Sequence, residues 1–439
     1  MATIRSLLAA LPTAITPPMA RPRLSMGELL RDCAALLSGR GEASGVALGT
    51  SILERYARLQ PEARARILGA LSAGRFGADR RRLEDAIARY HEHPDAATTL
   101  ALHKAAEPRR QELIRRLNLA PGGTAALVRM REDLIAALAD QARSSDLAAV
   151  DADFVHLFSS WFNRGFLLLK RIDWTTPAHI LEKIIRYEAV HQINSWDELR
   201  ARLEPADRRC FAFFHPTLED EPLIFVEVAL QGTIPDAIAP VLAAGRSPTD
   251  PTKATTAVFY SISNCQVGLK GVSFGNFLIK QVAEELKREL PSLRTFITLS
   301  PVPGFRAWLQ REAGAGNFLR ASDRRALEAL DRPDWATDPA ALKRARPVLQ
   351  AAVAHYLLQT KHGSGKPADP VARFHLGNGA RLDRINWMGD TSAKGLRQAA
   401  GFMVNYRYDL GQVERNHEAY ANRAEVVASQ LVRRMERSR

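Results

Sequence analysis

The chain has 439 residues, a formal net charge of +13 and 46% hydrophobic residues. Its length exceeds what one hydrophobic core usually supports, so two or three domains are expected. No run of about 18 apolar residues is present that could span a bilayer, which excludes an integral membrane protein.

The positive charge does not form a patch of the kind that follows nucleic-acid phosphates. Its excess is divided about evenly between the first 150 residues and the rest, and arginines alternate with glutamates on predicted helices, as in residues 109–116. Such alternation is typical of solvated helix faces. We therefore expect no nucleic-acid partner, although a diffuse positive field would attract an acidic small substrate.

The three cysteines, Cys33, Cys210 and Cys265, are far apart and lack Cys-x-x-Cys spacing. Neither a disulfide framework nor a zinc site is predicted, and a reducing compartment fits best. Several prolines in residues 1–25 favour a flexible, bacterial-type terminus over an organelle transit peptide. We expect a cytoplasmic protein.

Residues 26–160 are predicted to form an all-α helical bundle. Apolar residues recur at helical spacing, most clearly through Leu127, Met130, Leu134 and Leu138. No internal repeat or catalytic cluster is visible in this region. Helices of this kind commonly supply contacts between subunits, so we expect residues 26–160 to assemble an oligomer.

Residues 161–439 are predicted to form an α/β domain, although helical patterns continue to about residue 171. Strand patterns begin at residues 210–215 and 223–230, and the second of these has the apolar character of a central strand. A polar loop at residues 361–369 is flexible enough in composition to be a lid.

A strand, loop, helix and strand unit at residues 257–308 organises this domain. Residues 258–263 favour a strand, residues 277–290 have helical spacing, and residues 294–299 favour a second strand that stops at Ser300. The glycine loop between the first strand and the helix suits a phosphate or diphosphate. It has neither the P-loop nor the dinucleotide pattern, and a turn that only packs helix on strand is the alternative.

Two residues are candidates for chemistry. Ser300 follows a strand, at the edge of the sheet where ligands of open α/β sheets bind. The alternative is a structural role, in which Ser300 only caps the turn before Pro301. His375 lies in a predicted Gly- and Asn-rich turn where packing does not require an imidazole. No sequence rule joins the two, so the residues alone predict a binding α/β domain with a candidate Ser–His pair.

Four motifs, in the same order, resemble the malonyl-CoA decarboxylase family. They are FYSISNCQVGLKGVSFGNFLIKQV, TLSPVPGF, FHLGNGARLDRINWMGD and NYRYDL. The similarity covers residues 162 to 434. It implies an N-terminal helical domain followed by a GNAT-type α/β catalytic domain, assembled as a homotetramer.

The resemblance also implies roles for individual residues. Ser300 and His375 would be the catalytic pair, and the loop that binds malonyl-CoA would consist of Lys270, Gly271, Val272, Ser273, Phe274, Gly275 and Asn276. Animal relatives carry a glutamate where this chain has Ser273. A loop carboxylate that could orient the histidine is therefore missing, and the sequence does not identify its substitute.

Decarboxylation of malonyl-CoA to acetyl-CoA and CO2 fits these residues. Loss of CO2 leaves a thioester enolate, which needs donors at the carbonyl oxygen and an acid at the α-carbon. No clustered metal ligands and no biotinyl-lysine motif are present, so we expect no cofactor. The alternatives are acyl transfer from CoA to an amine, which a GNAT architecture also permits, and a basic helical scaffold or RNA-binding protein.

Overall fold

The computed structural model of the chain describes residues 25–39, 41–140, 145–272, 274, 277–315, 318–332, 334–363 and 365–437. The chain divides into two compact units, one ending at Phe154 and the other beginning at Val155. The predicted flexible terminus at residues 1–25 lies outside the described residues, apart from Ser25. None of the described helices is long and apolar enough to cross a membrane.

The first unit is helical, as predicted. Its helices are α1 (Met26–Leu36), α2 (Glu42–Ala57), α3 (Pro61–Ala70), α4 (Arg80–Glu92), α5 (Ala96–Ala106), α6 (Arg109–Asn118), α7 (Gly123–Asp140) and the first part of α8 (Ser145–Trp161). Leu127 and Leu134 on α7 are fully buried, which confirms the helical period. The Arg110 Nε donates to Asp153 Oδ2 at 2.5 Å, so a buried ion pair joins α6 to α8.

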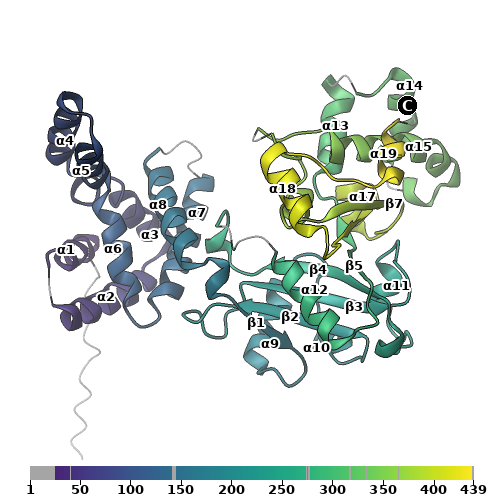
Figure 1. Ribbon diagram of the computed structural model, residues 1–439, viewed down its shortest axis with the longest axis horizontal. Coiled ribbons are helices and arrows are strands. Elements are labelled where there is room, and N and C mark those ends of the chain that lie inside the picture. The colour runs from purple at the N-terminus through teal and green to yellow at the C-terminus, as the bar shows by residue number, and fades with distance from the viewer. Residues whose placement is uncertain are drawn as a thin grey trace, which may run out of the picture. The chain divides into compact units, whose positions relative to one another are not determined.

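The second unit contains a mixed eight-stranded sheet in the order β1-β2-β3-β4-β5-β8-β6, with β7 also paired to β8 (Figure 1). Its strands are β1 (Leu168–Ile172), β2 (Arg208–Phe214), β3 (Ile224–Gln231), β4 (Thr256–Asn264), β5 (Thr295–Thr298), β6 (Ser300–Pro301), β7 (Arg381–Asn386) and β8 (Met403–Arg407). The helical prediction to residue 171 is wrong over β1, because antiparallel pairing with β2 overrides local pattern there.

The helices of the second unit are α9 (Ala178–Tyr187), α10 (Trp196–Leu203), α11 (Ala239–Leu242), α12 (Leu278–Glu289), α13 (Phe305–Ala315), α14 (Ala321–Leu327), α15 (Pro339–Leu358), α16 (Pro370–Gly377), α17 (Ala393–Ala399), α18 (Val413–Arg423) and α19 (Gln430–Arg437). α9 and α10 bury apolar residues against β2 and β3, and α19 packs on α15 and β7. The predicted βαβ unit is confirmed, since α12 connects the parallel strands β4 and β5.

β4 and β5 separate at their carboxyl ends. The two strands pair only from Thr256–Thr295 to Phe259–Thr298. β4 then continues to Asn264, whereas the segment that follows β5 moves away and pairs with β8. The predicted strand over residues 294–299 is confirmed as β5, but the predicted stop at Ser300 is wrong, because pairing resumes there as β6. Pro301 pairs with Met403, because proline lacks only the N–H and its carbonyl can still accept a hydrogen bond. The separation opens the sheet beside Ser300.

Candidate active site

Ser300 and His375 meet inside the second unit. The Oγ of Ser300, on β6, lies 3.0 Å from Nε2 of His375, on α16. Only 6% of Ser300 and 2% of His375 are exposed. The prediction that His375 lies in a turn is wrong. Asp369 caps the helix and Pro370 occupies its first turn, so the chain is helical from Pro370 to Gly377.

A chain of hydrogen bonds passes through the imidazole. Ser300 Oγ donates to Thr298 Oγ1 at 2.9 Å, and the Tyr408 hydroxyl lies 2.9 Å from His375 Nδ1. Because the single hydroxyl proton of Ser300 is used at Thr298, Nε2 of His375 must donate to Ser300, and Nδ1 then accepts from Tyr408. The Tyr406 ring stacks on the imidazole at a centroid distance of 4.6 Å. These contacts fix the ring and its tautomer.

His375 and its partner Tyr408 are both uncharged. Burial lowers the pKa of His375 from its ordinary value to about 3. Burial also raises the pKa of Tyr408 well above the ordinary range of a phenol. Both side chains are therefore neutral near pH 7, and the imidazole offers an N–H group rather than a positive charge.

An inner cavity of about 230 Å³ lies beside the pair, where β4 and β5 separate. Its wall is mostly apolar and contains Val190, Phe259, Tyr260, Ile262, Asn264, Ser300, Pro301, Pro370, Val371, Phe374 and His375. Among these described residues there is no lysine, arginine, aspartate or glutamate. A small acyl group would therefore meet Ser300 and His375 in mostly apolar surroundings.

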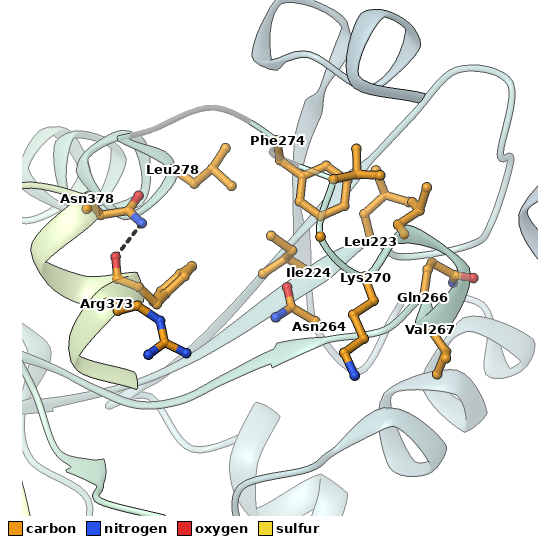
Figure 2. Close-up of a pocket in the computed structure, with 15 residues that line it drawn as sticks. Leu223, Ile224, Asn264, Gln266, Val267, Lys270, Phe274, Leu278, Arg373 and Asn378 are labelled. Carbon is orange, nitrogen blue, oxygen red and sulfur yellow. Dashed lines mark hydrogen bonds between the residues drawn. The ribbon is translucent and has the colours of Figure 1, made fainter. Parts of the chain in front are cut away.

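An outer cavity of about 570 Å³ adjoins the inner one, since Asn264 and Phe374 line both. Figure 2 shows Arg373 and Lys270 on opposite sides of this outer cavity, with Asn264 between them. Arg373 comes from α16 and Lys270 from the loop after β4. Two cationic side chains at one cavity suit a ligand that carries phosphate groups.

The predicted CoA loop contributes to the outer cavity. Lys270, Gly271, Val272 and Phe274 line it, whereas Ser273, Gly275 and Asn276 lie outside the described residues. Gly271 has φ of +81°, a conformation that side chains other than glycine rarely adopt.

The start of α12 is attached to the helix that carries His375. Phe277 adopts a left-handed conformation, and its N–H donates to Asn378 Oδ1 at 3.1 Å. Leu278, the first residue of α12, lines the outer cavity. The free N–H groups of a helix N-terminus favour anions, so this end of α12 suits a negatively charged part of a ligand.

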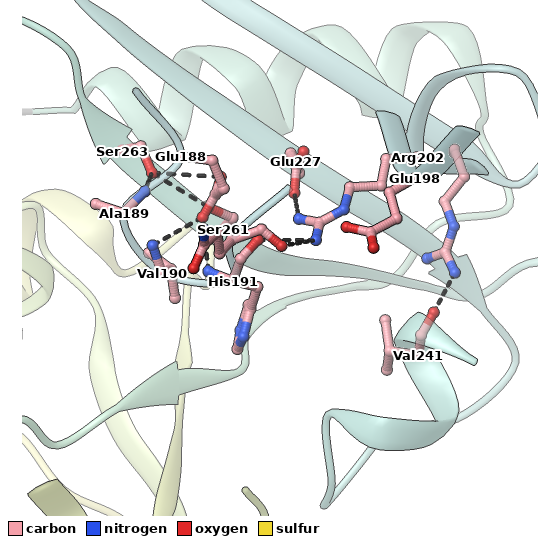
Figure 3. A network of polar contacts seen from close by, with 12 residues as sticks. Glu188, Ala189, Val190, His191, Glu198, Arg202, Glu227, Val241, Ser261 and Ser263 are labelled. Atoms are coloured by element: carbon pink, nitrogen blue, oxygen red, sulfur yellow. Dashed lines mark hydrogen bonds and ion pairs between the residues drawn. The ribbon is translucent and has the colours of Figure 1, made fainter. Parts of the chain in front are cut away.

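The segment after α9 closes one side of the inner cavity through Val190. Glu188 is buried, and its Oε1 accepts hydrogen bonds from the N–H groups of Val190 and His191 at 2.8 and 2.7 Å. Ser261 on β4 donates to the same carboxylate at 2.7 Å (Figure 3). Glu188 thus holds Val190 against β4.

Several of these residues were not predicted from the sequence. Tyr408 and Asn378 lie within the motifs NYRYDL and FHLGNGA, so a signal for them existed, but nothing indicated which residue of each motif would face the site. Glu188 carries no local signal, because its partners come from another strand. In the described part of the chain, no three His, Cys, Asp or Glu side chains come together as metal ligands would.

Comparisons with known proteins agree on one family. The model of the malonyl-CoA decarboxylase C-terminal domain matches residues 165–439, and that of the N-terminal domain matches residues 76–162. The mitochondrial malonyl-CoA decarboxylase of Anser anser anser is 37% identical over 400 residues, which cover 84% of this chain and 79% of that protein. The mitochondrial malonyl-CoA decarboxylase of Mus musculus is 34% identical over 401 residues, which cover 84% and 81%.

Solved structures give the same result. The crystal structure of malonyl-CoA decarboxylase from Rhodopseudomonas palustris superposes with a TM-score of 0.90 at 58% identity, covering 94% of this chain and all of that one. The corresponding structure from Agrobacterium vitis has a TM-score of 0.87 at 56% identity, and the shares covered are 93% and 99%.

Proposed function

The chain belongs to the malonyl-CoA decarboxylase family, and from this premise we propose that Ser300 and His375 together protonate the enolate formed when malonyl-CoA loses CO2. The enzyme is accordingly a carboxy-lyase. The observation that carries the proposal is the 3.0 Å contact between Ser300 Oγ and His375 Nε2 on the wall of the inner cavity.

The outer cavity would hold the CoA portion of malonyl-CoA. Lys270 and Arg373 would contact its phosphates, and the N-terminus of α12 would face its diphosphate. Asn264 and Phe374, which line both cavities, mark the route by which the thioester would reach the inner cavity. We also propose that Ser273, Gly275 and Asn276 belong to this binding loop, as the resemblance implies.

The chemical step would take place in the inner cavity. The bond between the α-carbon and the carboxylate breaks, CO2 leaves, and the electron pair forms the thioester enolate. The α-carbon then takes one proton through the pair, and a proton from water restores the enzyme. Because Nε2 carries a proton in the tautomer described above, His375 would be the proton donor at the cavity wall. Ser300 would turn its hydroxyl away from Thr298 to hydrogen-bond the departing carboxylate.

The lining of the inner cavity supports decarboxylation rather than simple acyl binding. CO2 is apolar whereas a carboxylate is strongly hydrated, so a wall without a lysine or arginine among its described residues favours the departing product over the bound anion. A preorganised donor at the thioester oxygen would contribute about 3 kcal/mol in the transition state.

We further propose that the second unit is a GNAT-type domain and that residues 26–160 assemble a homotetramer. The separation of the parallel strands β4 and β5, with the ligand cavities at the opening, supports the first assignment. The helical first unit contains none of the proposed site residues, and a role in assembly is consistent with that division.

Mixing the purified chain with malonyl-CoA tests the function. The expected result is one CO2 and one acetyl-CoA for each malonyl-CoA consumed, without an added acceptor. Malonyl transfer to an amine with no CO2 would instead indicate an acyltransferase. Salt-dependent RNA binding without turnover would indicate the scaffold or RNA-binding alternative.

A further inference from the structure

Helix α16 forms one wall of the inner cavity. Pro370, Val371, Phe374 and His375 all line the inner cavity, and all belong to this eight-residue helix. A small rotation or shift of α16 would change the separation of Ser300 and His375. Whatever fixes the start of α16 therefore controls the geometry of the proposed pair.

Asp369 fixes that start. Its side chain is fully buried, and its Oδ1 accepts hydrogen bonds from the N–H groups of Val371 and Ala372, both at 2.9 Å. Capping by a carboxylate satisfies N–H groups that have no partner within the helix and adds a favourable interaction with the helix dipole. The predicted lid at residues 361–369 thus ends in a rigid, buried anchor.

The second oxygen of Asp369 faces the segment that carries Ser300. Oδ2 lies 3.8 Å from the position that a Cβ on Gly304 would take, and that same Cβ would overlap the Tyr356 hydroxyl. No hydrogen bond of ordinary geometry reaches Oδ2 from a described residue, although the Gly304 N–H favours the charged carboxylate and the Tyr356 hydroxyl also interacts with it. Gly304 belongs to TLSPVPGF, the motif of Ser300. One buried carboxylate therefore adjoins both the segment that carries Ser300 and the helix that carries His375.

We propose that Asp369 is a positioning residue whose ionised carboxylate holds α16 against the Gly304 turn and so sets the distance between Ser300 and His375. The proposal rests on the proposed function. Asp369 does not line either cavity among the described residues, so it acts through the helix rather than on the substrate.

The charge on Asp369 changes in an accessible pH range. Burial raises the pKa of Asp369 to about 6. The backbone N–H groups that donate hydrogen bonds to its carboxylate and the nearby Arg373 guanidinium oppose this rise, because they favour the ionised form. The other titratable groups that face it are Tyr356 on α15, with Arg311 of α13 beyond that hydroxyl, and Tyr406 on β8.

An acid limb near pH 6 would ordinarily be assigned to a histidine. Here His375 stays neutral until about pH 3, so it cannot produce such a limb. Burial raises the pKa of Glu227 to about 7 as well, so the Asp369 variant below is needed to show which carboxyl produces the limb.

The kcat for CO2 release between pH 5 and 8 tests the proposal with two matched variants. Asp369→Asn keeps a side chain that caps helices but cannot ionise. Asp338→Asn is the control, because Asp338 caps α15 through Ala340 and Ala341 in the same Asp-Pro context, with a more exposed side chain.

We expect the kcat of the wild-type chain to fall severalfold below pH 6. In Asp369→Asn the kcat should stay near that low value at every pH, with KM changed far less. The Asp338→Asn profile should match the wild type. A flat wild-type profile, an acid limb that survives in Asp369→Asn, or a wild-type kcat for that variant at pH 7.5 would each overturn the proposal.

Tyr356→Phe provides a second variant if Asp369→Asn does not fold. It leaves the cap intact but removes a hydroxyl beside the carboxylate, so the midpoint of the acid limb should rise. An unchanged midpoint would contradict the role of Asp369.

Thermal unfolding separates this proposal from the proposed function. If the wild-type chain releases no CO2, the function fails, but the anchor is still measurable. Because the folded-state pKa of Asp369 is raised, the folded chain binds more protons than the unfolded chain between about pH 4 and 6. The wild-type chain should therefore lose stability relative to Asp369→Asn as the pH rises from 5 to 7. A Tm difference that does not change with pH would contradict the assigned titration.

Discussion

The imidazole of His375 lies between two hydroxyl groups, with Ser300 Oγ at 3.0 Å from Nε2 and Tyr408 at 2.9 Å from Nδ1. No carboxylate of the described residues hydrogen-bonds the ring, so the pair differs from a charge-stabilised serine triad. Ser300 comes from the sheet, His375 from a helix 75 residues later, and the opening between β4 and β5 leaves room for the acyl group.

Tyr408→Phe should lower kcat by about 5- to 10-fold, because loss of one hydrogen bond of about 1 to 1.4 kcal/mol leaves the imidazole tautomer less well defined. The KM for malonyl-CoA should change little. Tyr420→Phe is the control, since it removes a buried hydroxyl that has no hydrogen-bond partner among the described residues. Equal kcat values for the two variants would show that Tyr408 does not orient His375.

Gly271→Val should raise the KM for malonyl-CoA, because it distorts a loop that lines the outer cavity. Gly245→Val is the matched control. Both glycines have positive φ, +81° and +70°, and a Cβ at either would meet nothing within 4 Å. Both variants should lose about 1 to 3 kcal/mol of stability from backbone strain, so the difference between them reports on the loop rather than on the fold. If the two KM values are the same, the loop does not bind substrate.

The pH dependence of stability should reveal the neutral state of His375. Its pKa is about 3 in the folded chain and 6.5 in the unfolded chain. Between these values the unfolded chain binds one more proton, so acidification destabilises the fold by up to about 1.4 kcal/mol per pH unit. His375→Asn removes this effect. The free energy of unfolding, measured in denaturant at pH 6.5 and 5.5, should therefore fall less in the variant. Equal decreases would place the histidine in a solvated or charged environment.

The helical unit should determine the oligomeric state. Light scattering of the full chain should give a tetramer, whereas a chain that begins at Asp153 should give a smaller species. This truncation removes the part of α8 before Asp153, so circular dichroism is needed to show that the remaining unit is folded. The same oligomeric state for both folded chains would remove residues 26–160 from the assembly.

Local patterns predicted the parts of the site that are continuous in sequence. Residues 258–263 and 294–299 have the composition of strands, and residues 277–290 have helical spacing, so β4, β5 and α12 were all predicted. The position of Ser300 at the end of a strand followed from them. His375 was a candidate from its Gly- and Asn-rich surroundings, but only the motif resemblance connected it to Ser300. Their contact depends on β8 and α16, which bring distant segments together.

Other features depend on long-range partners that a local pattern does not contain. Strand β1 forms because β2 offers a pairing edge. Asp369 lies at the end of a polar segment, where solvent exposure is the ordinary expectation, yet it is fully buried as the cap of α16. The predicted turn at His375 followed from Gly377, Asn378 and Gly379, which in fact end the helix rather than surround the histidine.

A kinetic double-mutant cycle on Ser300 and His375 tests the central claim most directly. If the two residues act as one unit, Ser300→Ala and His375→Asn should each lower kcat by on the order of 10² to 10⁴, and the double variant should be scarcely slower than the slower single one. KM should change far less, and circular dichroism should show that all three variants are folded. A Ser300→Ala variant with a lowered Tm but an unchanged kcat would contradict the account, because Ser300 would then only stabilise the turn before Pro301.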